Sequence, residues 1–190
     1  AARPTYRADN TTVADSRSVQ EAMQTIASDG QLNIQNGLNN QQGRILAGGL
    51  TQLSGSGRLN NNAGLLNISD LLWRNGSTFS NLGGSIHAGQ SRVEAASLDN
   101  NGGRWISLQG LQLSSSGQLN NIGGQLVSGA YTQISAGQLD NSKGRLLSTA
   151  ALNLNVNGQA NNQNGIIQAN QSLLLQSGGL DNLSGQIASA

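Results

Sequence analysis

The sequence predicts an all-β fold in which the chain winds into a parallel β-helix, a solenoid of about eight coils with a period of about 20 residues. Three observations predict it. One motif, clearest in Leu119-Asn120-Asn121-Ile122-Gly123-Gly124-Gln125-Leu126, recurs at intervals of 19 to 21 residues from Leu38 onward. Between copies, apolar residues such as Leu111 and Leu113 alternate with polar ones, which is typical of half-buried strands of 3 to 5 residues. One such coil cannot bury its own apolar residues, but stacked coils pair each strand with its equivalents on either side.

Residues 1–30 differ in composition from the repeats, and we expect a separate cap or linker there, with the β-helix occupying residues 31–190. The segment holds the only proline, the only methionine and seven of the nineteen charged residues. Val13 stands where the repeat has glycine, so the segment is not counted as a coil. Ser18-Val19-Gln20-Glu21 fits a capping box, and Val19, Ala22 or Met23, and Ile26 share one helical face. A short helix is therefore predicted.

Two columns of the repeat are invariant. Position 0 of each copy is Leu38, Leu59, Phe79, Leu98, Leu119, Leu139, Ala160 and Leu180, which begin coils one to eight. Position +2 is asparagine every time: Asn40, Asn61, Asn81, Asn100, Asn121, Asn141, Asn162 and Asn182. Position +5 is glycine every time: Gly43, Gly64, Gly84, Gly103, Gly124, Gly144, Gly165 and Gly185. Both columns are expected to be structural.

Each column has a physical explanation in a stack. The side-chain amide of asparagine can bond its own turn and also donate a hydrogen bond to the asparagine one coil along, which predicts an Asn ladder. Glycine at +5 indicates either a positive φ or no room for a Cβ atom. Position +7 is always apolar, and it places Trp105 in the core. At position +1 acid and amide alternate from Asp99 onward, so that carboxylates of successive coils are kept about 10 Å apart.

The motif, as in Leu139-Asp140-Asn141-Ser142-Lys143-Gly144-Arg145-Leu146, resembles the filamentous haemagglutinin repeats. The resemblance covers residues 31–190 and implies a right-handed parallel β-helix. It also implies a very large exoprotein of a Gram-negative bacterium, secreted through an outer-membrane two-partner secretion transporter to the cell surface. The family includes adhesins and contact-dependent growth inhibition toxins, so a role in cell adhesion or virulence is implied. By this resemblance the chain is expected to be a shaft segment that projects a distal binding or toxin region.

Composition argues against several other functions. Charged residues make up 10% of the chain and the net charge is +1, so no nucleic-acid interface is expected. There is no cysteine, and His87 is the only histidine, so no catalytic site, cofactor, metal site or small-molecule substrate is expected. The last repeat stops at Ala190, ten residues after Leu180, which indicates a fragment of a longer protein. We expect this fragment to be monomeric.

Two alternatives to the shaft stay open. In the first, the chain is a module that binds a host glycan or a target-cell receptor, and its candidate surface is Trp73, Arg74, His87 and Arg92. That surface would lie in coils two to four, and coils two and three are the least regular; an exposed tryptophan would support it. In the second, the chain is a polysaccharide-cleaving β-helix that uses Asp99, Asp140 and Asp181. Asparagines stand at the equivalent positions, so a role in Asx turns is the favoured interpretation of these carboxylates.

Overall fold

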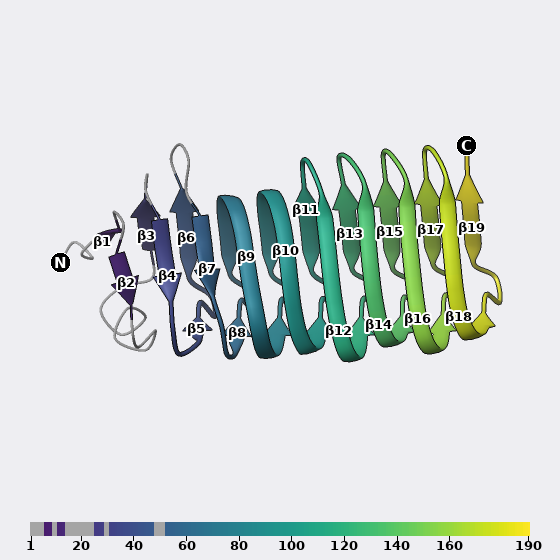
Figure 1. The fold of residues 1–190 in the computed structure, drawn as a ribbon, viewed down its shortest axis with the longest axis horizontal. Helices are drawn as coiled ribbons and strands as arrows, with labels where there is room; N and C mark the ends of the chain where they lie inside the picture. The colour runs from purple at the N-terminus through teal and green to yellow at the C-terminus, as the bar shows by residue number, and fades with distance from the viewer. Residues whose placement is uncertain (1–5, 9–10, 14–24, 29–30, 48–51) are drawn as a thin grey trace.

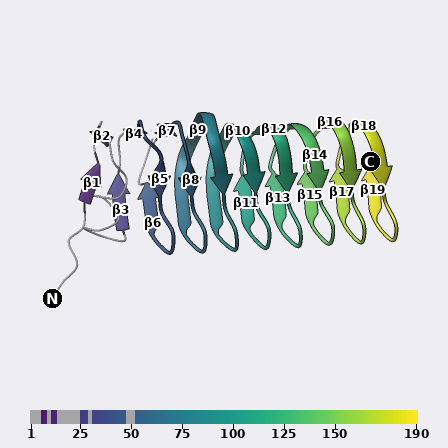
Figure 2. The same cartoon turned by 90° about the horizontal axis from the view of Figure 1, so that it is seen from below.

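A computed structural model describes residues 6–8, 11–13, 25–28, 31–47 and 52–190. In these ranges the regular structure consists of strands alone, which join in one 19-stranded sheet with parallel pairing throughout. Two perpendicular views show the coils stacked along one axis, with β1 (Tyr6–Ala8) and β19 (Gln186–Ser189) at opposite ends (Figures 1 and 2). The predicted parallel β-helix is confirmed. None of the described ranges contains a helix with the length and hydrophobicity that crossing a membrane requires.

Coils four to seven each have one short and one long strand. The short strands are β11 (Arg104–Ser107), β13 (Gln125–Ser128), β15 (Arg145–Ser148) and β17 (Ile166–Ala169). The long strands are β12 (Leu111–Asn120), β14 (Thr132–Asp140), β16 (Leu152–Asn161) and β18 (Leu173–Asp181). Short strands pair with short and long with long, always one coil apart. Sequence alternation predicts strands of 3 to 5 residues. In the structure each long strand instead joins two such pieces at a shift in pairing register, which in β12 falls between Ser115 and Gln118.

Coils two and three lack the break between short and long strands. Their strands β9 (Leu65–Ser80) and β10 (Ser85–Asp99) run through the corner without interruption. The reason is corner length. Ala88 pairs with Ser107, and Ser91 pairs with Leu111, so coil three has two corner residues where coil four has three. The irregularity that the sequence indicates in these coils is therefore a shorter corner within the same stack.

The first described strands lie in the same stack as the repeats. They are β2 (Thr11–Val13), β3 (Thr25–Ser28), β4 (Gln31–Ile34), β5 (Leu38–Asn39), β6 (Arg44–Ala47), β7 (Gln52–Gly55) and β8 (Leu59–Asn60). Val13 pairs with Ile34, and Ile26 pairs with Ile45, so Ile26 belongs to a strand and the helix prediction is wrong there. The rest of that helix, residues 18–24, lies outside the described residues. The cap or linker role of residues 1–30 stays a prediction.

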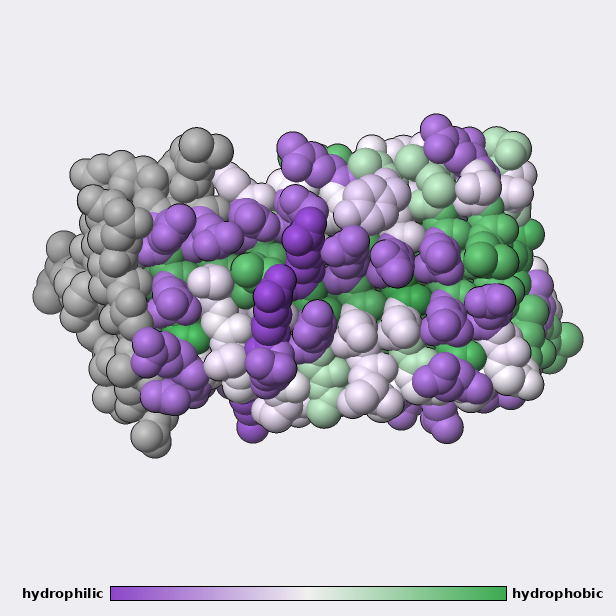
Figure 3. All heavy atoms as spheres, in the orientation of Figure 1, coloured by the Kyte–Doolittle hydropathy of each residue, from purple (hydrophilic) through white to green (hydrophobic). Residues whose placement is uncertain are grey.

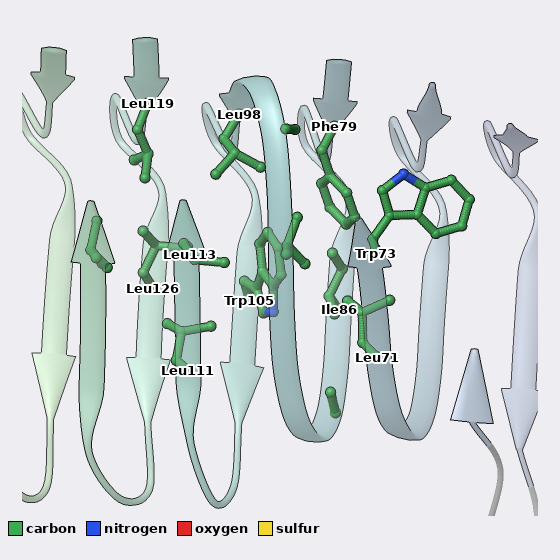
Figure 4. Close-up of a cluster of buried hydrophobic side chains, with 14 of the residues drawn as sticks. Leu71, Trp73, Phe79, Ile86, Leu98, Trp105, Leu111, Leu113, Leu119 and Leu126 are labelled. Atoms are coloured by element: carbon green, nitrogen blue, oxygen red, sulfur yellow. The ribbon is translucent and has the colours of Figure 1, made fainter. Parts of the chain in front are cut away.

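The core is a continuous apolar column inside the coils (Figure 4). Its largest side chains are Trp73, Phe79 and Trp105, each at most 1% exposed. Phe79 and Trp105 stack with ring centroids 5.0 Å apart. Both indole N–H groups donate hydrogen bonds, that of Trp73 to the Gly57 carbonyl oxygen and that of Trp105 to Ser91 Oγ. Burial of Trp105 confirms its assignment to the apolar column at +7.

Candidate functional site

The eight asparagines at +2 form a ladder along the axis. Each Nδ2 donates a hydrogen bond to Oδ1 of the asparagine in the following coil, with seven donor–acceptor distances of 2.7 or 2.8 Å from Asn40 to Asn182. The same Nδ2 atoms also donate to backbone carbonyl oxygens, as Asn121 Nδ2 does to that of Arg145 at 3.1 Å. From Asn40 to Asn162 these side chains are buried. The ladder thus satisfies a line of buried polar groups that would otherwise be costly.

The glycines at +5 stand where no side chain fits. From Gly64 onward, a Cβ atom at this position would overlap the carbonyl oxygen of the ladder asparagine in the preceding coil, such as Asn100 for Gly124. At Gly124 it would also lie 2.5 Å from Asn121 Oδ1. Of the two explanations that the sequence leaves open, lack of room for Cβ is the one observed.

Positive φ belongs to position +4 instead. The residues there have φ between 52° and 62°: Gln42, Ala63, Gly83, Gly102, Gly123, Lys143, Asn164 and Ser184. A Cβ atom at Gly83, Gly102 or Gly123 would have no neighbour within 4 Å, so this position is open to side chains but strained for them.

Replacing Lys143 by glycine is expected to stabilise the protein by about 0.5 to 1 kcal/mol, because it relieves the left-handed strain that an L-residue has at φ 57°. Its backbone N–H donates to the Gln163 carbonyl oxygen at 2.9 Å, and glycine keeps that bond. Urea unfolding of Lys143→Gly, with Lys143→Ala as the control that removes the side chain but keeps a Cβ, checks this. Equal stability of the two variants would contradict it.

The carboxylates at +1 accept hydrogen bonds from backbone N–H groups within the turns. Asp99 Oδ1 accepts a hydrogen bond from Asn101 N–H, and Asp140 Oδ1 accepts one from Ser142 N–H, both at 2.9 Å. Hydrogen bonds donated to Asp181 by the Leu183 backbone N–H and by the Gln163 side chain hold the pKa of that carboxyl below its ordinary value. Asn120 lies between the first two carboxylates in the stack. This arrangement places no two aspartates of the +1 column in adjacent coils.

The four residues of the candidate ligand surface separate into three places. Trp73 is fully buried, so its indole is not available to stack on a sugar and its place on that surface is wrong. His87 is exposed just before the corner, beside a hollow of about 550 Å³ that Asn67, Asp70 and Leu108 also line. Leu108, 70% exposed, belongs to the three-residue corner of coil four and borders the hollow over the shorter corners of coils two and three.

Arg74 and Arg92 lie together on another face. They line a hollow of about 310 Å³ across β9, β10, β12 and β14, and Arg74 also lines a second hollow of about 280 Å³ across β4, β7 and β9. Arg74 lines both hollows, which follow one another along this face, and together we call them the axial groove. Figure 3 shows this face, where a line of hydrophobic atoms runs along the axis between rows of more hydrophilic residues.

The axial groove has two banks set by strand register. One bank is the row Asn33, Ser54, Leu72, Arg92, Gln112 and Gln133, in which each residue pairs with the next. The other bank is the row Gln35, Ser56, Arg74, Glu94, Ser114 and Ser135. The inward residues between the banks, Ile34, Gly55, Val93 and Leu113, form the floor. In the part of the chain that the structure describes, no cluster of three His, Cys, Asp or Glu side chains is placed to hold a metal ion.

Comparison with known families identifies the repeat. A model described as "Haemagglutinin repeat" matches residues 10–90, 53–123, 109–163 and 148–190. These overlapping matches cover almost the whole chain, including part of the segment before residue 31. No curated protein and no solved structure matches the chain significantly.

Proposed function

The chain belongs to the haemagglutinin repeat family, and from this we propose that it is a shaft segment of a large filamentous-haemagglutinin-like exoprotein. The repeats of this family are typical of secreted or surface exoproteins, so we place the parent protein on the surface of a Gram-negative bacterium, exported by an outer-membrane two-partner secretion transporter. The segment projects a distal region, either adhesive or a growth inhibition toxin, away from the producing cell.

One observation carries the proposal. The coils stack with parallel strand pairing from β4 to β19, so each added coil lengthens the rod by about 4.8 Å. A rod of this kind is suited to holding a distal region at a distance from the cell. The family is one of structural repeats and not a known enzyme family, which agrees with a mechanical role.

Deletion of whole coils tests the shaft. In the parent exoprotein, removal of residues 79–118 or of residues 119–159 takes out two coils and rejoins equivalent positions of the repeat. A shaft tolerates both deletions: the protein is still displayed on the cell surface, and adhesion to or inhibition of target cells is largely retained. Loss of surface display with either deletion would contradict the shaft, whereas loss of target-cell binding with the first deletion alone would place a recognition site in coils three and four.

A second function, recognition of a glycan or receptor on another cell, is favoured by the axial groove. There the described surface brings two exposed arginines to one furrow, which a plain spacer does not require. This candidate and the shaft are compatible, because a shaft can carry a lateral site.

A further inference from the structure

The direction of the axial groove restricts what it can hold. Its banks cross six successive strands, β4, β7, β9, β10, β12 and β14, so it runs along the solenoid axis for about 24 Å. A ligand that fills it is therefore extended, and it meets equivalent side chains once per coil, about every 4.8 Å.

The bank chemistry suits hydroxyl groups. Gln112 and Gln133 on one bank and Ser114 and Ser135 on the other present amides and hydroxyls in successive coils. Both kinds of group donate and accept hydrogen bonds, as sugar hydroxyls do. Three of these four side chains are exposed; that of Gln112 is half-buried, and its Nε2 donates to the Tyr131 hydroxyl at 2.9 Å, which leaves its Oε1 as the acceptor. Their repeat of about 4.8 Å is close to the length of one hexose in an extended chain.

The groove is less suited to a peptide. The strands that form its floor are already paired on both sides within the stack, so no free edge is available to add a peptide strand. An extended peptide also advances about 3.3 Å per residue, which does not match the coil spacing.

The charges in the groove favour an anion. Arg74 and Arg92 are both exposed and lie on opposite banks in adjacent coils. Glu94 lies on the same bank as Arg74, in the coil of Arg92. Within the described ranges, neither arginine forms an ion pair. Their guanidinium groups are therefore available to carboxylates, which they can bind through paired N–H donors.

We infer that the axial groove binds a linear polysaccharide built from uronic acids, with Arg74 and Arg92 on its carboxylates and the Gln and Ser rows on its hydroxyls. This inference gives the recognition function above a site and a ligand class. It is independent of the shaft role, which the coil deletions test separately.

Calorimetric titration with hexagalacturonate, and with its methyl ester as the uncharged analogue, tests the inference. We expect saturable binding of the acid, at least tenfold weaker binding of the ester, and about tenfold weaker binding of the acid by Arg74→Ala or Arg92→Ala. Glu94→Gln removes a repulsive charge and is expected to strengthen binding about twofold to fivefold. Ser114→Tyr keeps the charge but fills the groove, and it is expected to abolish binding.

The matched control is the double variant Arg104→Ala and Arg145→Ala, whose exposed arginines lie on the short strands β11 and β15, away from the groove. It carries the same loss of charge as Arg74→Ala with Arg92→Ala, and we expect less than a twofold change. Circular dichroism confirms that each variant keeps its strands. Equal weakening by both double variants, equal binding of the ester, binding of poly-glutamate as tight as that of hexagalacturonate, or no binding at all would each overturn the inference.

Discussion

Replacing Gly124 by alanine is expected to destabilise the protein by about 3 kcal/mol or more. The added methyl group would overlap the backbone carbonyl oxygen of Asn100 and lie 2.5 Å from Asn121 Oδ1. Neither atom can move away at low energetic cost, because the first belongs to the turn of the preceding coil and the second is held by hydrogen bonds in the Asn ladder. Urea unfolding followed by circular dichroism measures the loss.

The neighbouring residue supplies the control. Gly123 has φ +62°, and an added Cβ atom there would meet nothing within 4 Å, so Gly123→Ala introduces only conformational strain of about 1 kcal/mol. The two variants carry the same substitution one residue apart in one turn. If they lose equal stability, crowding by the preceding coil is not the reason for glycine at +5.

The difference between positions +5 and +4 shows which backbone constraints can be predicted from the sequence. Position +5 is invariant because a clash with backbone is too costly for any side chain. Position +4 varies among Gln42, Ala63, Lys143 and others because its strain is smaller. The invariant glycine therefore identifies position +5 from the sequence alone. The positive φ at position +4 leaves no invariant residue, so it is identified only from backbone geometry.

The core and the ladder were predictable because they repeat in register with the motif. The facing of Trp73 was only partly predictable: alternation with Leu71 favours an inward side chain, but Leu71-Leu72-Trp73 offers no polar residue to fix the alternation. The structure turns Leu72 outward and buries Trp73 beside Gly55, where a Cβ atom would meet the indole. A glycine one coil before a bulky residue is the signal that would have found this.

The axial groove could not be derived from the motif. Its banks lie after the corner, and the corner has two residues in coil three and three in coil four, so a fixed count from position 0 misaligns the rows. The sequence indicates Arg74 and Arg92 as candidates, but their place in one groove depends on that register. His87 precedes the corner and therefore lies on a different face.

Replacing Asn121 by aspartate is expected to destabilise the protein by about 3 to 5 kcal/mol at pH 7. The fully buried Asn121 amide donates to Asn141 Oδ1 at 2.7 Å and to the Arg145 carbonyl oxygen at 3.1 Å. Asn121 Oδ1 accepts from Asn100 Nδ2 and could still do so as a carboxylate oxygen, but the second oxygen would put a third acceptor beside those two, and the buried charge would have no cation to balance it. The expected loss exceeds that of the same change at Asn60, a half-buried +1 residue whose Oδ1 accepts from Asn62 N–H as the natural aspartates do in their turns.

The effect of pH separates charge from shape in this variant. Burial raises the folded-state pKa of the introduced carboxyl above its unfolded value of about 3.9, so the fold favours the protonated form. The penalty is therefore smallest below about pH 4, where the carboxyl is neutral in both states, and it grows as the pH rises through the higher folded pKa. Urea unfolding at several pH values from 3.5 to 8, relative to the original protein, should show this trend for Asn121→Asp and not for Asn60→Asp. A penalty independent of pH would mean that the ladder depends on amide geometry alone, and that the exclusion of charge is not what keeps asparagine in every coil.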